Sequence, residues 1–265
     1  MSFLLKDQLG REVKVDTNSP QRIISLVPSQ TELLFDLGLD EEIVGITKFC
    51  IHPENKVRQK TKTGGTKKLN IEKIKSLHPT LIIANKEENT KEQVEELAKS
   101  FPVWISDVTD LPGVLEMILS VGKMTGKKRE AEELSREISE NIARLAPLRE
   151  TKSAAYFIWK KPLMVAGKGT FINDMMKRCG FQNCFQNLDG HYPEISAEQL
   201  KQAKPELVLL SSEPYPFKEK HLSEFQKICP EAKVILVDGE IFSWYGSRLL
   251  QAPEYFRKLA EKLLR

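Results

Sequence analysis

The longest regular pattern of apolar and polar positions in the chain lies between Gly126 and Pro147. Its apolar residues recur at spacings of three or four, and glutamate and arginine fill most positions between them: Ala131, Leu134, Ile138, Ile142 and Leu145. This spacing places one narrow apolar stripe along an α-helix. About twenty residues at roughly 1.5 Å each would span about 30 Å, the width of a small domain. We therefore predict a long helix that connects two parts of the chain; the pattern of this segment alone fits an ordinary surface helix equally well.

Short apolar runs alternate with amphipathic stretches on both sides of this helix. A small hairpin comes first, because apolar residues flank a glycine-containing turn at 7–10. Predicted strands follow at 22–27, 43–46, 81–84 and 103–105, and after the long helix at 154–158, 163–166, 207–210 and 234–237. Helices are indicated between most of them. Strands that alternate with helices favour parallel sheets covered on both faces.

One unit of the pattern occurs twice. Residues 195–210 match residues 69–84 at a fixed offset of 126 positions, which pairs Glu72 with Glu198 and Pro79 with Pro205. The matched unit is a helix, a proline and a strand, and the order of elements around it also repeats. This indicates duplication of a whole lobe.

Composition narrows the class of protein. The 265 residues, 40% of them hydrophobic, suffice for two lobes with cores of their own. The net charge is only +3, and the chain has no stretch in which lysines and arginines are interleaved with aromatic residues. Both observations argue against a nucleic-acid partner. No apolar run approaches the roughly eighteen residues that span a bilayer. The four cysteines contain no CxxC pair, so buried thiols fit better than a disulfide framework or a zinc site.

The loops that follow predicted strands are the candidate site, because ligands of open parallel sheets bind beyond the carboxyl ends of the strands. These loops contain Phe49, Cys50, His52, Asn85 to Asn89, Trp159, Lys160, Lys161, Glu213, Tyr215, Phe242, Trp244, Tyr245 and Arg248, and a further loop contains His191 and Tyr192. Apolar rings with a few polar groups suit a large organic ligand. Some of the rings could instead seal an interface between lobes.

Enzymatic and metal-site patterns are weak. The chain has no GxSxG, HExxH or GxxxxGK[ST], and no GxGxxG follows a strand. Cys50 and His52 could in principle form a nucleophile and a base, but a strand-exit loop gives little support for this. Only His52 and His191 are placed for metal binding, without a matching carboxylate. We therefore predict no catalytic residue and no metal site.

Several segments together resemble a known family. They are Arg22 to Leu33 (RIISLVPSQTEL), the Gly64-Gly65-Thr66 turn, Asn70 to Ile74 with His78 to Ile83, and Phe242 to Arg248 (FSWYGSR). The chain resembles, over essentially its whole length, the helical-backbone substrate-binding proteins of ABC importers for cobalamin, ferric siderophores and haem. The resemblance implies an α/β fold of two Rossmann-like lobes with parallel sheets, joined by a single long backbone helix, with the ligand in the cleft between lobes. The expected division is 1–122 for the N-terminal lobe with its hairpin, 123–147 for the helix and 148–265 for the C-terminal lobe.

The cobalamin-binding branch is the nearest, since its members carry aromatic residues where this chain has Phe49 and Tyr192. By position, the resemblance implies ligand contacts from Phe49, Met164, Tyr192, Trp244 and Arg248; the neighbouring candidates are Cys50, His52, Trp159, His191 and Tyr245. Asn85 and Thr66 depart from the pattern of some cobalamin binders, which leaves the identity of the ligand open. The expected ligand is a corrinoid, or else an iron-siderophore or haem-type complex. It is a transported ligand, and no intrinsic cofactor is expected.

Glu72 and Glu198 are the expected docking residues for an ABC permease dimer, because the family uses one glutamate per lobe against permease arginines. Each stands two residues after a capping residue, Asn70 or Ser196. A carboxylate in the first helical turn is also favoured by the helix dipole by roughly 0.3 to 1 kcal/mol, so a purely stabilising role is the alternative.

The resemblance implies a monomer that is only peripheral to the membrane and is periplasmic or at the cell surface. Exported members carry a signal peptide, whereas Met1 stands directly at the hairpin. The sequence as given therefore predicts a cytoplasmic location, unless the start of the sequence is truncated. The alternative function is a cytosolic carrier of corrinoids or metal tetrapyrroles, or an enzyme accessory, that is not coupled to a transporter.

Overall fold

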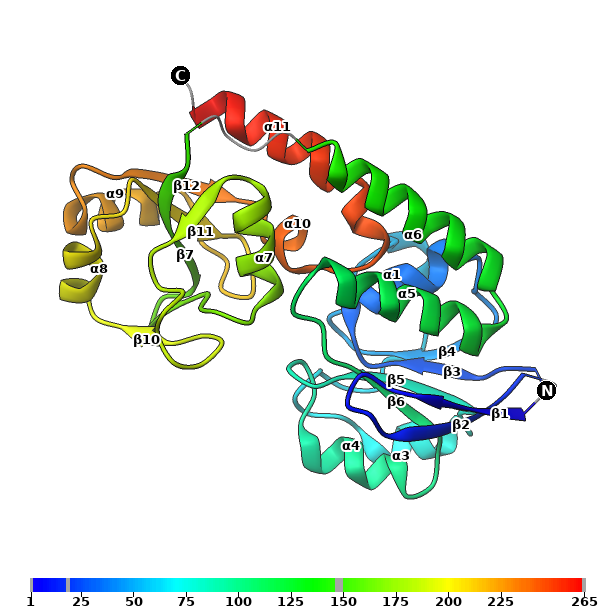
Figure 1. The fold of residues 1–265 in the computed structure, drawn as a ribbon. Coiled ribbons are helices and arrows are strands. Elements are labelled where there is room, and N and C mark those ends of the chain that lie inside the picture. Colours follow the sequence, from blue (N-terminus) through cyan, green and yellow to red (C-terminus); the bar gives the residue numbers. More distant parts are fainter. Residues whose placement is uncertain (1, 18–19, 146–149, 264–265) are drawn as a thin grey trace. The chain divides into compact units, whose positions relative to one another are not determined.

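The protein is described here by a computed structural model that covers residues 2–17, 20–145 and 150–263. It is an α/β protein that divides into two compact units (Figure 1). Unit 1 consists of Met1–Val108, Pro112–Glu140 and Tyr245–Arg248, and unit 2 of Thr109–Leu111, Asn141–Trp244 and Leu249–Arg265. The chain therefore passes from one unit to the other more than once, because four residues near the C-terminus return to unit 1.

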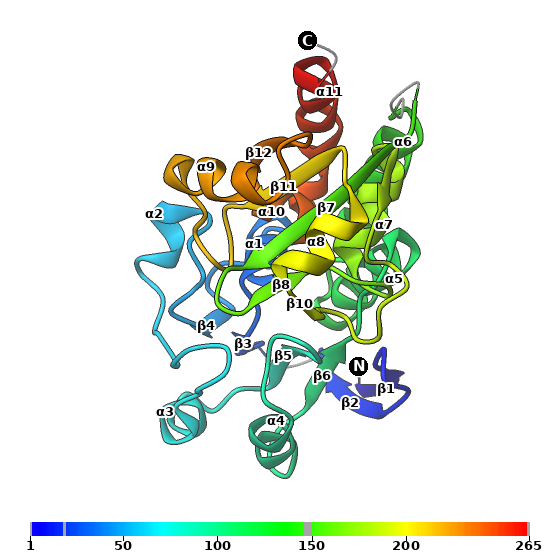
Figure 2. The ribbon, with the colours of Figure 1, turned by 90° about the vertical axis from the view of Figure 1, so that its left-hand side faces the viewer.

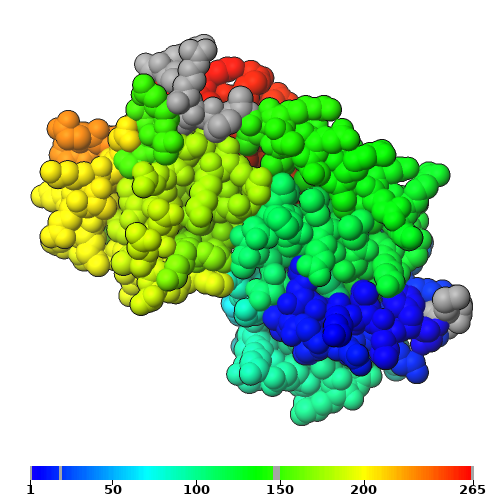
Figure 3. Space-filling view, viewed as in Figure 1, coloured from blue at the N-terminus to red at the C-terminus, as the bar shows by residue number. Residues whose placement is uncertain are grey.

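The N-terminal hairpin is confirmed. Strands β1 (Ser2–Lys6) and β2 (Glu12–Asp16) pair antiparallel. The Asp7 carboxylate accepts hydrogen bonds from the backbone N–H groups of Leu9 and Arg11, and Gly10 adopts a φ of 81° in the turn. The Gln8 N–H donates to the Ile105 carbonyl, so the hairpin is fixed to the rest of unit 1, on whose surface it lies (Figure 3).

Unit 1 contains a four-stranded, fully parallel sheet in the order β4-β3-β5-β6. Its strands are β3 (Ile23–Ser25), β4 (Ile43–Ile46), β5 (Leu81–Asn85) and β6 (Val103–Ser106). Nearly every residue in them is buried, which explains why the sequence reads as continuous apolar runs and not as an alternation. All four strands end at the same edge of the sheet, where the candidate loops begin.

Helices cover both faces of this sheet (Figures 1 and 2). Helices α3 (Ile71–Ser76) and α4 (Lys91–Ala98) pack against one face, where Ile74 and Leu97 join Ile24 and Ile82 in one apolar cluster. Helices α1 (Pro28–Asp36) and α5 (Leu111–Thr125) lie on the other side, and the short α2 (Glu54–Val57) follows β4. The two covered faces make this sheet an interior layer.

The predicted long helix is shorter than expected. Gly126, with a φ of 72°, separates α5 from α6 (Lys128–Ala143), whose sixteen residues span about 24 Å. In the predicted stripe, Ala131, Ile138 and Ile142 are buried, whereas Leu134 and Leu145 are partly exposed and Leu145 lies beyond the helix. The change from unit 1 to unit 2 falls within α6, after Glu140. Pro147 lies outside the described residues, and a separate connecting helix at 123–147 stays a prediction.

Unit 2 contains a mixed sheet, whereas the expectation was a parallel one. Strand β7 (Lys152–Trp159) pairs in parallel with β11 (Leu207–Ser211) and β9 (Phe181–Asn183), and β11 pairs in parallel with β12 (Lys233–Val237). Strand β8 (Leu163–Val165) is antiparallel to β7, and β10 (Glu194–Ile195) is antiparallel to β8. The reason is that only three residues, 160–162, connect β7 to β8. Such a short connection permits an antiparallel hairpin, whereas a parallel pair needs a crossover of about a dozen residues or more.

The helices of unit 2 also lie on both faces of their sheet (Figure 1). Helices α8 (Ala197–Ala203) and α9 (Glu219–Ile228) pack on one face, where Leu200 and Phe225 join Phe157 and Val208 in the core. The other side holds α7 (Phe171–Arg178), α10 (Gly239–Ser243) and α11 (Ala252–Leu263), and a short 3₁₀ helix, η1 (Ser247–Leu250), precedes α11.

The predicted repeat is confirmed. Helices α3 and α8 begin 126 residues apart, as do strands β5 and β11. Each helix has a side-chain cap: Asn70 accepts a hydrogen bond from the Lys73 N–H, and Ser196 accepts one from the Gln199 N–H. Both units thus contain the same capped helix, followed by a proline and a buried strand.

Candidate ligand-binding site

Phe49 is the most exposed candidate in unit 1. It follows β4, and 51% of its surface is exposed. The Lys48 ammonium lies 5.1 Å from the centre of its ring. The backbone of Gly65 comes close to the ring edge, since a Cβ at that position would be 3.2 Å from Phe49 Cε2. The Gly64-Gly65 turn therefore supports a ring that remains open to solvent.

Cys50 lies next to this ring but faces the interior. Only 2% of it is exposed, and its Sγ lies 3.1 Å from Thr31 Oγ1 and 3.3 Å from Thr47 Oγ1. Burial raises the pKa of the Cys50 thiol, and the two threonine hydrogen bonds only partly oppose this. The side chain therefore lies in the interior of unit 1, where burial disfavours the thiolate. His52, two residues later, is half-buried.

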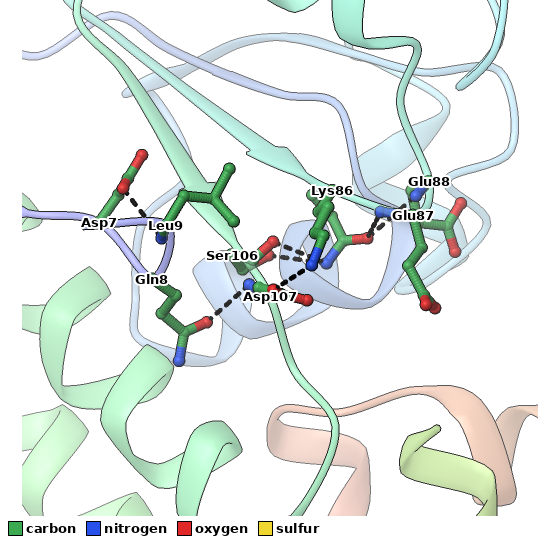
Figure 4. A network of polar contacts seen from close by, with 9 residues as sticks. Asp7, Gln8, Leu9, Lys86, Glu87, Glu88, Ser106 and Asp107 are labelled. Atoms are coloured by element: carbon green, nitrogen blue, oxygen red, sulfur yellow. Dashed lines mark hydrogen bonds and ion pairs between the residues drawn. The ribbon is translucent and has the colours of Figure 1, made fainter. Parts of the chain in front are cut away.

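The ends of β5 and β6 are joined by a network of amide hydrogen bonds (Figure 4). Asn85 accepts hydrogen bonds from the N–H groups of Glu87 and Glu88, and its own amide donates to the Ser106 carbonyl at 3.1 Å. Asn89 accepts a hydrogen bond from the Asn85 N–H at 2.8 Å. This explains why an amide and not an aromatic ring stands at 85: its side chain fixes the loop.

Charged groups border the same network (Figure 4). Lys86 forms an ion pair of 2.6 Å with Asp107, whose N–H donates to the Gln8 side chain. Glu88 is half-buried, and desolvation raises its pKa, although the charge of Lys67 opposes the shift. Thr66 is buried, and its carbonyl accepts a hydrogen bond from the Asn89 amide.

Arg248 belongs to unit 1 through an ion pair with Glu32. Its Nε and Nη2 atoms donate to the two carboxylate oxygens of Glu32 at 2.9 and 2.7 Å. Both side chains are only about a tenth exposed, at 10% and 12%. The sequence did not predict this pair, because 216 positions separate the partners. Tyr245, at the start of the same four-residue segment, is buried.

Trp159 is the exposed ring of unit 2, at the end of β7. Its surface is 38% exposed, and its indole N–H donates to the Lys161 carbonyl at 3.0 Å. Its ring meets Tyr215 edge-on, with centroids 5.5 Å apart, and Tyr215 in turn meets Phe217 at 4.7 Å. A row of edge-to-face contacts thus connects the exposed indole to buried Phe225 in the core.

Trp244 is buried and tied to the loop after β11. Its indole N–H donates to Glu213 Oε1 at 2.8 Å, and the Ser243 hydroxyl donates to the same oxygen at 2.7 Å. Glu213 therefore joins the loop after β11 to the end of helix α10, a role that its place in the sequence did not indicate. Gly239 allows this close packing, because a Cβ there would lie 2.3 Å from Ser211 Oγ.

Met164, His191 and Tyr192 are half-buried and belong to unit 2. Met164 is in β8, opposite Glu194 of β10. The rings of His191 and Tyr192 are perpendicular, with centroids 6.5 Å apart. The His191 carbonyl accepts a hydrogen bond from the Gly167 N–H, which fixes this loop close to β8.

The structure thus groups the candidates within each unit. Phe49, Cys50 and His52 share one loop of unit 1. Unit 1 also contains Tyr245 and Arg248, which come from a segment near the C-terminus. The other candidates belong to unit 2: Trp159, Met164, His191, Tyr192 and Trp244. Among the described residues, no three histidine, cysteine or acidic side chains are grouped so as to hold a metal ion. The described helices include none with the length and apolar character of a membrane span.

The expected docking residues occupy equivalent places. Glu72 and Glu198 are the second residues of α3 and α8, and both are exposed. The side chain of Glu72 is 86% exposed and lies 3.4 Å from the Lys75 ammonium.

Two α/β units that share a capped helix and strand, with aromatic rings beyond the strand ends, are the organisation of a solute-binding protein. The family model described as periplasmic binding protein matches residues 23–230, well over half of the chain. The chain therefore belongs to the periplasmic binding protein family. The resemblance predicted from the sequence motifs is confirmed.

Individual relatives agree with this assignment. The vitamin B12-binding protein of Pectobacterium carotovorum subsp. carotovorum (strain PC1) is 27% identical over 241 residues, which cover 89% of this chain and 86% of that protein. The solved structure of the periplasmic vitamin B12 binding protein BtuF of Vibrio cholerae matches with a TM-score of 0.78 at 21% identity, covering 92% of this chain and 99% of that one. The periplasmic haem binding protein HutB of the same organism also gives 0.78 at 20% identity, covering 93% and 100%. These solved structures share the fold.

Proposed function

We propose that the protein captures a corrinoid, or a haem-type or ferric siderophore complex of similar size, and delivers it to an ABC permease. The observation that carries this proposal is one exposed aromatic ring beyond a strand end in each unit, Phe49 and Trp159. Large organic ligands gain most of their affinity from burying such apolar faces. The vitamin B12-binding relative, which aligns with most of the chain, favours a corrinoid.

Both rings are held before any ligand arrives. The backbone of Gly65 lies against Phe49, and Tyr215 together with the Lys161 carbonyl fixes Trp159. A side chain that is already ordered loses less rotamer entropy on binding, so more of its contact energy appears as affinity. The proposed contacts from Met164 and Tyr192 would add to these two anchors.

The test compares Phe49→Ala and Trp159→Ala with Leu119→Ala, a control on α5 whose side chain is also exposed, at 42%. Calorimetric titration with cobalamin, cobinamide and haem should show each aromatic variant weakened by about 1 to 3 kcal/mol, the range for a lost aromatic anchor. Leu119→Ala should bind like the native protein. Unchanged affinity in both aromatic variants would place the site elsewhere.

We also propose that Glu72 and Glu198 dock to the permease. Their equivalent positions support this, since a permease with two like subunits offers one complementary group to each unit. Glu72→Gln with Glu198→Gln should leave ligand affinity and melting temperature nearly unchanged and should abolish delivery to the permease. Normal delivery would leave stabilisation of the helix dipole as the better explanation.

Delivery requires the protein to act on the outer side of the membrane, as the periplasmic relatives do. The alternative is a carrier of the same ligands without a permease. The two differ in one observable: the carrier would bind its ligand but would neither associate with the permease nor stimulate its ATPase.

A further inference from the structure

His78 and Lys204 form the same corner in the two units. Each stands between the repeated helix and the proline that leads into the repeated strand, and the two positions differ by the repeat offset of 126. Their φ angles are 46° and 43°. Within residues 2–17, 20–145 and 150–263, they are the two residues other than glycine with positive φ.

This backbone conformation is unfavourable for both residues. A Cβ clashes in the left-handed region, and a following proline further restricts the preceding residue. Glycine is the usual choice at the end of a helix that closes in this way. Strained residues of this kind cluster at functional sites, and both units keep a long side chain where glycine would relieve the strain.

The two side chains share their chemistry. Both side chains are exposed hydrogen-bond donors of the basic type, and neither side chain forms a hydrogen bond or ion pair with the part of the chain that the structure describes, although the His78 backbone N–H donates to the Lys75 carbonyl. A basic group at a helix C-terminus also interacts favourably with the helix dipole. That interaction accounts for a basic residue at this place, and it predicts a contribution to stability alone.

Each repeated helix therefore presents a carboxylate at its start and a basic group just after its end. In unit 1 these are Glu72 and His78, and in unit 2 they are Glu198 and Lys204. About six residues of helix separate them, or roughly 9 Å along the helix axis. A carboxylate and a basic hydrogen-bond donor at a fixed separation set the register of a partner better than one polar group does.

We propose that His78 and Lys204 are docking contacts, each of which meets an acidic side chain on one of the two like subunits of the permease. This inference rests on the proposed delivery function. On the permease, each group that contacts a glutamate would then have an acidic side chain roughly 9 Å away, which is the separation between the carboxylate and the basic group on each repeated helix.

The test is the double variant His78→Asn with Lys204→Asn, because asparagine tolerates positive φ without the basic group. Binding to the permease in lipid nanodiscs should weaken by about tenfold, mainly through a slower association rate that depends less on salt. Melting temperature and ligand affinity should stay the same or rise. The control, Lys91→Asn with Lys227→Asn, removes exposed lysines from α4 and α9 and should bind the permease normally.

The glutamate variant is measured in parallel to separate the two proposals. The corner variant is the double variant His78→Asn with Lys204→Asn. If Glu72→Gln with Glu198→Gln loses permease binding while the corner variant binds like the Lys91→Asn with Lys227→Asn control, docking by His78 and Lys204 is wrong and docking by the glutamates stands. A corner variant with a lower melting temperature and unchanged permease binding would assign the basic groups to the helix dipole. Reduced binding in the corner variant alone would retain the corner and reject the glutamates.

Discussion

Replacing Arg248 by methionine should show how unit 1 holds the four residues that return to it. The guanidinium donates two hydrogen bonds to the Glu32 carboxylate, and both groups are about nine-tenths buried. Methionine keeps part of the apolar stem and removes the charge. The Glu32 carboxylate then remains in a poorly hydrated place without this counter-ion.

The expected destabilisation at about pH 7 is roughly 2 to 4 kcal/mol, slightly below the 3 to 5 typical of a fully buried pair because some hydration remains. Burial already raises the pKa of Glu32, although the hydrogen bond and charge of Arg248 oppose the shift. A group with a raised folded-state pKa favours the folded protein at low pH, and this contribution is lost as pH rises through that pKa. The destabilisation in Arg248→Met should therefore be smaller at about pH 4.5 than at about pH 7.

Urea unfolding followed by circular dichroism measures this at both pH values. The control is Arg257→Met, whose ion pair with Glu261 is more than half exposed and should contribute less than about 1 kcal/mol. Adding Glu32→Gln to Arg248→Met should recover part of the stability at neutral pH, because the unpaired charge is gone. The reasoning is refuted if Arg248→Met is as stable as the control at both pH values.

Three further predictions concern packing, thiols and the ligand. Gly122→Ala should lower the unfolding free energy by about 1 to 3 kcal/mol in urea titrations, because its Cβ would lie 2.3 Å from Ala131 Cβ. Cys184, which is half-buried, should react with a thiol reagent first, and the three buried cysteines should react only after unfolding; equal rates would contradict the burial. Trp244→Ala should lower the melting temperature, because its indole N–H donates a hydrogen bond to Glu213, and it should also lower ligand affinity if the ring contacts the ligand. Tyr192→Ala should lower ligand affinity alone.

The features predictable from the sequence depend on neighbouring residues. The hairpin turn at Asp7 to Gly10, the caps Asn70 and Ser196, and the alternation of strands and helices follow from local hydrogen bonds and apolar periodicity. The offset of 126 could be found because the same local pattern occurs twice. Gly126 was placed correctly at the end of a helical segment, but its helix was predicted a few residues too long, as element ends are poorly encoded.

The site was less predictable because its geometry depends on distant contacts. The inward-facing thiol of Cys50 is set by Thr31, and the anchoring of Trp244 by Glu213, and neither partner is adjacent in the chain. Arg248 was a candidate ligand contact, yet its bond to Glu32 joins opposite ends of the sequence. In contrast, the loop alone predicts Phe49 as a site residue, and its exposed ring is consistent with that prediction.

The most direct test of the central claim is a calorimetric titration of the native protein with cobalamin, cobinamide, haem and a ferric siderophore, with a melting curve at each saturating concentration. We predict saturable binding of one member of this panel, with a melting temperature that rises with ligand concentration because only the folded state binds. The absence of saturable binding to all four would contradict the proposal that this protein captures a large metal complex.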